Sequence, residues 1–393
     1  MQDNTYWESC GLGGRRTMNR AWIELDEAAL EHNIRRYQSL LPPGCEIMGV
    51  VKADAYGHGA RAVAASLEKW GVRHFATATL DEAVRLREYG VRSDILILGY
   101  THPDSFRLLA EHGLTQTATC PAHAKALERY GAEHGTPLNV HIAVDTGMHR
   151  IGFLPEDTEE IRRLYESPCL HVTGIYSHLC VADTEDEEDA AFSRRQAEIF
   201  RRVVEDLQGR VADLGKIHLL SSYAAVNYPE YAYDYARLGI LMFGVKSSPA
   251  DYLREDLQPR PVMTLKAHIT SVREIGPGES VSYGRIFRAE RPTKIASVAI
   301  GYADGIPRCL SGGKLRAIVR GQYARGAGRI CMDQLMLDVT GIDGVQTGDE
   351  AIFIGQDGGC AIRAEELAEN AGSITNELFS RLGARVEGRR YTT

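Results

Sequence analysis

The segment Val50-Val51-Lys52-Ala53-Asp54-Ala55-Tyr56-Gly57-His58-Gly59 is the most informative part of this chain. Residues 47–51 are mostly apolar and are predicted to form a buried strand, and a single lysine follows directly. Lys52 would then lie where a barrel strand reaches its C-terminal mouth. A partly desolvated lysine there has a lowered pKa, which suits Schiff-base chemistry. Because most lysines at strand ends are exposed and structural, the rest of the chain must decide between these interpretations.

Apolar or β-branched runs recur along the first two thirds of the chain. They predict strands at residues 47–51, 74–78, 95–98, 116–119, 140–144, 172–176, 217–220 and 238–242. Helical spacing of apolar residues appears between most of them, at 60–70, 80–89, 105–112, 122–130, 158–165 and 190–207. This alternation is typical of a (β/α)8 barrel. A doubly wound open sheet is the alternative, but no Gly-x-Gly-x-x-Gly motif follows the first strand. We therefore predict an α/β, TIM-like barrel.

The pattern changes from about Pro261 onwards. Short alternating segments, separated by glycine-rich turns, occur at 265–269, 295–299, 317–319, 335–339 and 351–354, and a helical stretch lies within 363–382. These features predict a mainly β second domain. The predicted division of the chain is an extension at 1–18, a barrel domain at 19–258 and a mainly β C-terminal domain at 259–393.

Bulk properties restrict the class of protein. The net charge of −8 disfavours a nucleic-acid partner. No segment is apolar over the length that a membrane span needs, and residues 1–18 contain no hydrophobic signal region. The eight cysteines form no Cys-x-x-Cys pair, which indicates reduced thiols in the cytoplasm and neither disulfides nor a metal site.

Polar residues gather at the predicted C-terminal ends of the barrel strands, where chemistry is found in this fold. Lys52 follows the first strand and His178 follows the sixth. The motif Asp145-Thr146-Gly147-Met148-His149-Arg150 follows the fifth strand and ends in an arginine that suits a carboxylate.

The ends of the last two strands predict a phosphate site. Ser222 follows the seventh strand, and Arg237-Leu238-Gly239-Ile240 opens the eighth. The Ser222 hydroxyl and the backbone amides of Gly239 and Ile240 would form a phosphate cradle, which barrels of this type build from these two loops. A lysine at the mouth together with such a cradle indicates pyridoxal 5′-phosphate as the cofactor.

Several motifs occur in an order that identifies a family. They are residues 51–59, 145–152 and 237–244 in the barrel, and Val281-Ser282-Tyr283-Gly284, Gly301-Tyr302-Ala303-Asp304-Gly305 and Gly328-Arg329-Ile330-Cys331-Met332-Asp333-Gln334 in the second domain. In these motifs the chain resembles the fold-type III alanine racemases over essentially its whole length after Met18. The resemblance turns Lys52 from an ordinary lysine into the expected cofactor-binding residue.

The resemblance implies a two-base mechanism in a homodimer. Lys52 would bind the cofactor and act as the base on one face of the substrate Cα. Tyr283, contributed by the second domain of a partner subunit, would act on the opposite face. Racemisation needs an acid and a base on opposite sides, and lysine and tyrosine can exchange these roles.

The same resemblance assigns the remaining contacts. Arg237 would meet the pyridine nitrogen of the cofactor, with His178 orienting it, and an arginine that keeps its proton makes the ring a weak electron sink. Arg150 and the amide of Met332 would bind the substrate carboxylate. Tyr302 and Arg329 match residues that line the entrance. The phosphate would be held by Tyr56, Ser222, Gly239 and Ile240.

Two positions depart from the family pattern. Many alanine racemases carry a carbamylated lysine where this chain has Ala143, so Arg150 would be held by a bound anion or a neighbouring side chain. The family usually has Thr-Ile-Pro-Tyr-Glu where this chain reads Ser373-Ile374-Thr375-Asn376-Glu377. Asparagine is smaller than tyrosine and offers a donor and an acceptor, which suits a substrate hydroxyl.

Asn376 and the Asp-Thr-Gly-Met-His-Arg motif are also similar to the serine/alanine racemase domains of vancomycin-resistance clusters. We therefore predict a racemase of serine and/or alanine that supplies D-amino acid for peptidoglycan precursors. It would be cytoplasmic, either free or as the cytosolic domain of a longer membrane-anchored protein. The alternatives are a plain alanine racemase, a decarboxylase of the same fold and a non-catalytic barrel that binds the cofactor. Arg237 disfavours the decarboxylase, and the second domain disfavours the non-catalytic barrel.

Overall fold

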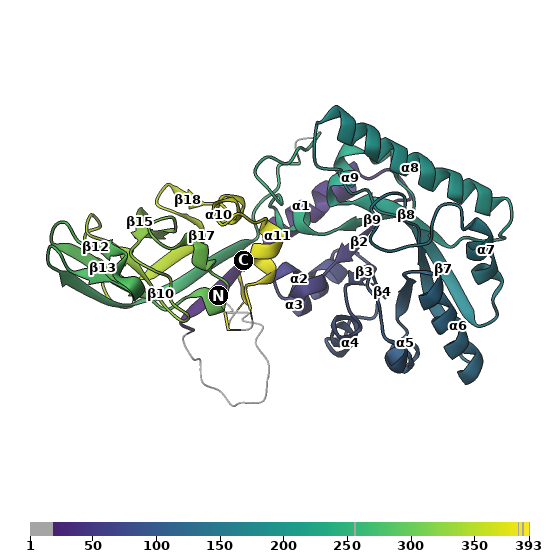
Figure 1. Ribbon diagram of the computed structural model, residues 1–393, viewed down its shortest axis with the longest axis horizontal. Helices are drawn as coiled ribbons and strands as arrows, with labels where there is room; N and C mark the ends of the chain where they lie inside the picture. The colour runs from purple at the N-terminus through teal and green to yellow at the C-terminus, as the bar shows by residue number, and fades with distance from the viewer. Residues whose placement is uncertain (1–18, 255–256, 384, 387–388, 393) are drawn as a thin grey trace.

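The structure, a computed structural model, describes residues 19–254, 257–383, 385, 386 and 389–392. The predicted extension at 1–18 lies outside this part. The described chain has two parts, a barrel surrounded by helices and an elongated region of strands (Figure 1). The predicted architecture, a TIM-like barrel followed by a mainly β domain, is confirmed.

The barrel consists of eight parallel strands that close on themselves. They are β2 (Glu46–Val50), β3 (His74–Thr77), β4 (Asp94–Ile97), β5 (Thr115–Ala118), β6 (Leu138–Ala143), β7 (Leu170–Tyr176), β8 (Lys216–Ser221) and β9 (Tyr235–Leu238). The helices between them are α2 (Lys52–Tyr56), α3 (Ala60–Lys69), α4 (Leu80–Glu88), α5 (Phe106–Glu111), α6 (Pro121–His134), α7 (Thr158–Glu166), α8 (Glu187–Gln208) and α9 (Ser222–Asn227).

The prediction of the last barrel strand at 238–242 is wrong. The strand ends at Leu238, and after Gly239 the apolar run forms the 3-10 turn η3 (Ile240–Phe243). The side chain of Asn33 in helix α1 (Glu27–Leu40) donates to the carbonyl of Met242 at 3.1 Å. This carbonyl is therefore hydrogen-bonded by a side chain and not by a neighbouring strand. A fully buried apolar run has the same sequence pattern whether it forms a strand or a 3-10 turn, and for this reason the sequence analysis misplaced the strand. Arg237 therefore lies inside the strand and not at its start.

The second domain is a nine-stranded sheet in the order β18-β17-β14-β15-β16-β13-β10-β1-β19. The strands in chain order are β1 (Ala21–Asp26), β10 (Met263–Ile275), β13 (Thr293–Val298), β14 (Arg316–Val319), β15 (Gln322–Gly326), β16 (Leu335–Asp338), β17 (Glu350–Asp357), β18 (Cys360–Ile362) and β19 (Arg389–Thr392). A separate pair, β11 (Ser280–Val281) and β12 (Phe287–Arg288), precedes β13. Strand β1 pairs antiparallel with β10 and therefore belongs to this sheet, although it precedes α1 and the barrel in the chain. The predicted division assigned residues 19–258 to the barrel.

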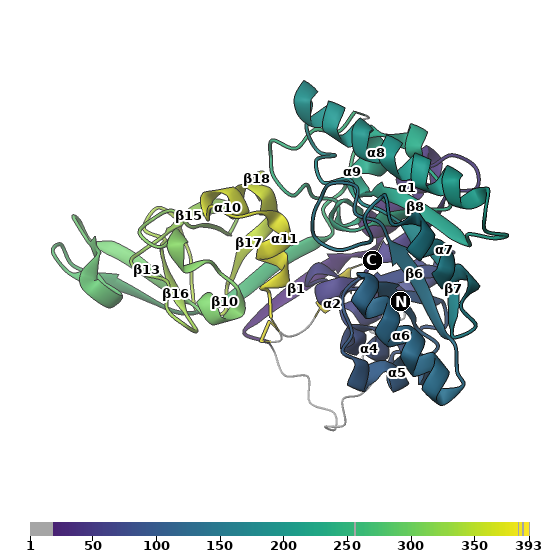
Figure 2. The same cartoon turned by 45° about the vertical axis from the view of Figure 1, so that its right-hand side comes forward.

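Two short helices lie where the parts meet, α10 (Ala364–Asn370) and α11 (Thr375–Ser380), and both views show α11 between the sheet and the barrel (Figures 1 and 2). Helix α11 packs on the α2 turn that starts with Lys52. A Cβ at Gly57 would lie 2.3 Å from the carbonyl oxygen of Phe379. The His58 ring stacks on Phe243 at 3.9 Å and meets the edge of Phe379 at 5.0 Å. These contacts hold α11 against the C-terminal end of the barrel.

The close approach at Gly57 makes a testable prediction. Gly57 has φ +75° and Gly71 has φ +92°, but no atom lies within 4 Å of a Cβ at Gly71. Gly71→Ala therefore adds only backbone strain, while Gly57→Ala also forces a clash with α11. Overpacking costs roughly 1–3 kcal/mol, so Gly57→Ala should lower the thermal unfolding midpoint more than Gly71→Ala. Equal midpoints in differential scanning calorimetry would show that α11 does not press on this turn.

Candidate active site

Lys52 begins a turn of unusual backbone geometry at the end of β2. The four residues 53–56 all have φ between 52° and 54°, the left-handed region that costs energy for residues other than glycine. The Ala53 amide donates to Glu82 Oε1 at 2.7 Å, and the Ala60 amide donates to Asp54 Oδ1 at 2.7 Å. The strained turn is thus fixed at both ends, which sets the direction of the lysine.

The surroundings of Lys52 favour its neutral amine. Burial lowers the pKa of Lys52, and the nearby Arg150 guanidinium lowers it further, while Glu82 opposes both. A larger fraction of Lys52 is therefore neutral near pH 7 than for an exposed lysine. A neutral amine can act as a nucleophile and as a base.

Arg237 is buried on β9, and no carboxylate of the described residues pairs with it. Its two terminal nitrogens donate to carbonyl oxygens and imidazole nitrogens: Nη1 to His218 Nδ1 at 2.6 Å and His218 O at 3.3 Å, and Nη2 to Ser177 O at 2.7 Å, Leu219 O at 3.0 Å and His178 Nδ1 at 3.2 Å. The guanidinium also lies 5.1 Å from the Tyr176 ring centroid. Burial lowers the pKa of Arg237 to about 10, so the group keeps its charge at neutral pH.

These contacts determine the tautomers of three histidines. Arginine has only donors, so His178 and His218 must accept through Nδ1 and carry their protons on Nε2. His218 Nε2 lies 3.0 Å from His141 Nδ1, which must therefore be the acceptor. Burial, together with the Arg237 charge, lowers the pKa of His141 and of His178 to about 3 and holds that of His218 well below its usual value. All three rings are neutral at physiological pH.

The arrangement leaves one donor of Arg237 for a ligand. The N–H groups on Nη1 and Nη2 have acceptors, whereas Nε–H makes no hydrogen bond to the described residues. A donor that cannot lose its proton suits a ring nitrogen that accepts a hydrogen bond. This geometry fits the pyridine nitrogen of the expected cofactor.

Residues of the predicted phosphate cradle lie close together, but one of the predicted donors is engaged within the protein. The Gly239 amide donates to Ser222 Oγ at 2.7 Å, so it is occupied within the protein. A Cβ at Gly239 would lie 2.6 Å from the Tyr56 hydroxyl oxygen, which explains the glycine. Burial raises the pKa of Tyr56 to about 12, so its hydroxyl stays a donor. The Ser222 and Tyr56 hydroxyls and the Ile240 amide remain suited to a phosphate.

Arg150 is exposed and makes no hydrogen bond or ion pair within the described part of the chain. The loop that carries Arg150 is held by its first residue, because Asp145 Oδ1 accepts hydrogen bonds from the amides of Gly147 at 2.9 Å and His149 at 3.0 Å. Ala143 is buried on β6, and no described side chain holds Arg150 in place of the family's carbamylated lysine. Arg150 is therefore available to an anion.

Asn376 presents an unsatisfied acceptor at the barrel mouth. Its Oδ1 atom is buried and has no hydrogen-bond partner among the described residues, and the same holds for the hydroxyl of Thr375. Both residues begin α11, the helix that packs on the Lys52 turn. A buried unpaired acceptor is costly, which indicates that a donor from outside the chain completes it.

One chain does not assemble all predicted site residues. Tyr283 and Met332 are 70% and 51% exposed on the second domain. Tyr283 follows β11. The strand paired with β11, β12, lies at the end of the second domain that is distant from the barrel (Figure 1). Lys52 and Tyr283 are thus not brought together within one chain.

The sequence analysis missed three contacts. Glu82 closes the Lys52 turn, although its Thr79-x-x-Glu82 capping-box pattern is visible in the sequence. His218 on the adjacent strand β8 and Tyr176 on β7, one strand further, contact Arg237, and only the closed barrel makes this apparent. The pattern alone gave no signal for either residue.

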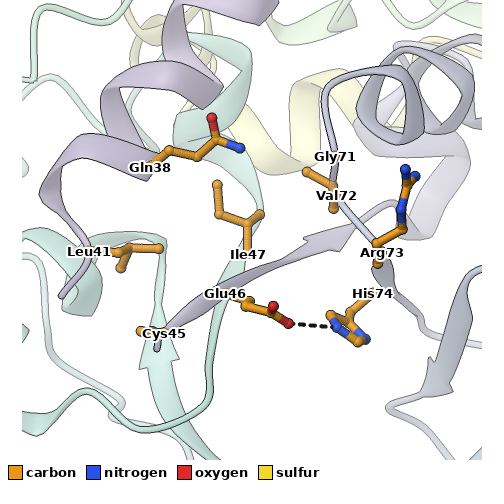
Figure 3. A pocket seen from close by; sticks show the side chains of 9 residues that line it. All are labelled: Gln38, Leu41, Cys45, Glu46, Ile47, Gly71, Val72, Arg73 and His74. Carbon is orange, nitrogen blue, oxygen red and sulfur yellow. Dashed lines mark hydrogen bonds and ion pairs between the residues drawn. The ribbon is translucent and has the colours of Figure 1, made fainter. Parts of the chain in front are cut away.

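A cavity of about 190 Å³ lies away from this chemistry. It is lined by residues at the starts of β2 and β3, including Glu46 and His74, which form a 2.9 Å contact (Figure 3). The starts of these strands are the opposite end of the barrel from Lys52. None of the predicted site residues lines this cavity.

Comparison with known proteins identifies the family. The profile for the alanine racemase N-terminal domain matches residues 25–247, and that for the C-terminal domain matches residues 262–391. The chain belongs to the alanine racemase family. This membership confirms pyridoxal 5′-phosphate as the expected cofactor.

Similar proteins are named amino-acid racemase, serine/alanine racemase or alanine racemase. The chain is 40% identical to an amino-acid racemase of Enterococcus faecalis, over 94% of this chain and 51% of that protein. It is 38% identical to a serine/alanine racemase of Enterococcus gallinarum, over 95% and 52%, and 39% identical to an alanine racemase of Synechocystis, over 92% and 96%. The chain thus spans about half the length of the two enterococcal relatives.

Solved structures agree with this placement. The alanine racemase of Clostridium difficile 630 superposes with a TM-score of 0.89 at 31% identity, over 96% of this chain and 97% of that one. The alanine racemase of Streptomyces coelicolor superposes with a TM-score of 0.86 at 35% identity, over 95% and 98%. Among the described residues, no helix is long and apolar enough to cross a membrane.

The neutral histidines predict an acid-sensitive barrel. Below about pH 6.5 the unfolded chain protonates His141, whereas the folded chain resists protonation until its pKa of about 3. Stability is therefore lost as the pH falls through this window, by up to about 1.4 kcal/mol per pH unit for one histidine. His141→Asn removes this contribution, and urea unfolding of the cofactor-free protein near pH 6 and pH 5 should show a smaller loss. An unchanged loss would contradict a neutral His141.

Proposed function

We propose that this chain is a pyridoxal-phosphate-dependent racemase that interconverts the L and D forms of serine and/or alanine. The proposal rests mainly on two residues of adjacent barrel strands. Lys52, which has a lowered pKa, follows β2, and the buried Arg237, which has one spare donor, lies on the paired strand β9. The family assignment supports the reaction class. D-amino acid for peptidoglycan precursors is the proposed product.

When bound, the cofactor makes the substrate Cα–H acidic by withdrawing electrons from it. Lys52 would hold the cofactor and take or return the Cα proton on one face. Arg237 would donate Nε–H to the ring nitrogen and retain its own proton, because its pKa of about 10 lies well above neutral. This retention limits electron withdrawal and disfavours reactions other than racemisation.

The second base is proposed to come from another copy of the chain. Tyr283 is 70% exposed and lies on the second domain, so a homodimer that places it over a neighbouring barrel would complete the site. Arg150 and the amide of the partner subunit's Met332 would bind the substrate carboxylate. The phosphate contacts would be those of Tyr56, Ser222 and Ile240.

Serine is the proposed additional substrate. The Oδ1 atom of Asn376 is a buried acceptor without a donor among the described residues. A serine hydroxyl would donate to it, and alanine offers no such group. A plain alanine racemase, with water on Asn376, is the alternative.

We also propose a cytoplasmic location, either as a free enzyme or as part of a membrane-anchored protein. The seven cysteines of the described chain are free thiols, which suits a reducing compartment.

The two bases can be tested together. Lys52→Ala should abolish both the visible absorbance of the lysine-bound cofactor and racemisation. Tyr283→Ala should lose proton exchange mainly with one enantiomer, because only one face loses its base. Equal mixing of the two inactive variants should restore about a quarter of the parental rate, since half of the dimers would contain one intact site. Verified mixed dimers without activity would place both bases on one chain.

The substrate preference can be tested at Asn376. Asn376→Tyr should lower kcat/KM for serine more than for alanine. The difference should correspond to an activation free energy of about 1–2 kcal/mol, as expected for the loss of an ordinary hydrogen bond. Asn376→Ala is the control for crowding, because it leaves room for the substrate but removes the acceptor. An unchanged serine-to-alanine ratio in Asn376→Tyr would identify a plain alanine racemase.

A further inference from the structure

A buried ion pair lies in the second domain, outside the residues assigned above. Asp304 is fully buried, and it ends the 3-10 turn η5 (Tyr302–Asp304). Arg20 Nη2 contacts Asp304 Oδ1 at 2.5 Å, and Arg20 Nη1 contacts Oδ2 at 3.1 Å. The Gly301 amide also donates to Asp304 Oδ2, at 2.8 Å. Both oxygens of the carboxylate are therefore engaged.

Arg20 joins this turn to the loop that carries Met332. Its Nη1 also donates to the carbonyls of Ala299 at 2.8 Å and of Asp333 at 3.2 Å. Arg385 reinforces the junction, because its Nη2 lies 2.5 Å from Asp333 Oδ1 and its Nε lies 3.6 Å from Asp304 Oδ1. Two arginines and two aspartates thus join four segments: Arg20 before β1, the turn at 299–304, the loop with Asp333, and Arg385.

The two loops are also joined through their backbones. The Tyr302 amide donates to Cys331 O at 3.0 Å, and the Ala303 amide donates to Met332 O at 3.0 Å. A Cβ at Gly301 would lie 2.4 Å from both of these carbonyl oxygens, so only glycine allows this approach. On the outer side of the junction, Tyr302 and Met332 are 37% and 51% exposed.

We propose that the Arg20–Asp304 pair is a positioning element that aims Tyr302 and Met332 at the active site of the partner subunit. It rests on the homodimer of the proposed function. The partners of Asp304 lie in the second domain or in the residue that leads into β1, so the pair has no direct contact with Lys52 or Arg237 of its own barrel. Removing the carboxylate charge leaves a cation beside a buried site without compensation. The two loops would then lose their common anchor.

A second route must be separated from this one. A Cβ at Gly305 would lie 2.7 Å from the carbonyl oxygen of Arg381, which follows α11. Disturbing the turn could thus reach the same chain's own Lys52 through α11. Dimers with the substitution on a chosen subunit distinguish the two routes.

The experiment uses purified heterodimers with one working lysine. In the trans arrangement, one subunit carries Asp304→Asn and the other carries Lys52→Ala, so the working barrel meets unaltered loops. In the cis arrangement, one subunit carries both substitutions and the other carries none, so the working barrel meets altered loops. The reference is a dimer of Lys52→Ala with the unsubstituted chain. The three dimers should bind equal cofactor per lysine, as measured by visible absorbance.

We expect the trans dimer to match the reference and the cis dimer to lose about 10-fold in kcat/KM, the size of loss typical for groups that orient a functional residue. The loss should fall mainly on KM, because the Met332 amide binds the substrate carboxylate. Arg20→Lys, which keeps the charge, should restore most of the activity in the cis arrangement relative to Arg20→Gln. If Asp304→Asn does not fold, the comparison of Arg20→Lys with Arg20→Gln tests the same inference.

Four results would overturn the inference. Impairment of the trans dimer alone would assign the effect to the subunit's own α11. Equal impairment of both dimers would indicate a general structural role, and full activity in both would show that the pair positions nothing. An unsubstituted dimer that does not racemise would refute the proposed function, and this inference with it.

Discussion

The buried guanidinium of Arg237 is the constraint around which the barrel mouth is arranged. A buried charge without a carboxylate partner is tolerated only when polar groups solvate it. Three carbonyl oxygens and two imidazole nitrogens, located within β8 or just beyond the end of β7, supply that solvation. Every one of them is an acceptor, so a single side chain fixes two tautomers directly and a third through His218. The remaining donor, Nε–H, suits a ligand with a ring nitrogen that accepts a hydrogen bond.

The lysine side of the mouth depends on a different constraint. The turn after Lys52 keeps four residues in the left-handed region, and strain of this kind persists only when the surroundings enforce it. Glu82 enforces it from α4, and α11 closes over it through Gly57 and Phe379. Because α11 lies between β18 and β19 of the second sheet, the second domain contacts the Lys52 turn within one chain.

The sequence predicted the barrel, the second domain and most of the mouth because these depend on local patterns. Alternating strands and helices mark the barrel, and residues that follow parallel strands must converge at one end. Lys52, His178 and Ser222 were located in this way, whereas Arg237 was placed at the start of the last strand and lies inside it. The last strand was misplaced because residues 240–243 are apolar and buried whether extended or coiled. The role of β1 in the second sheet was missed because its partner β10 lies more than two hundred residues away.

By itself, then, the sequence determined the fold class, the family and the identity of the lysine and arginine at the mouth. Only the tertiary structure decided which groups surround them. His218 contacts Arg237 from the adjacent strand β8, and Tyr176 contacts it from β7, one strand further. The Gly239 amide donates to Ser222, and Arg20 pairs with Asp304 across 284 residues. The physical reason is that hydrogen bonds and ion pairs act over a few ångströms in space, whereas sequence patterns record only which residues are near along the chain.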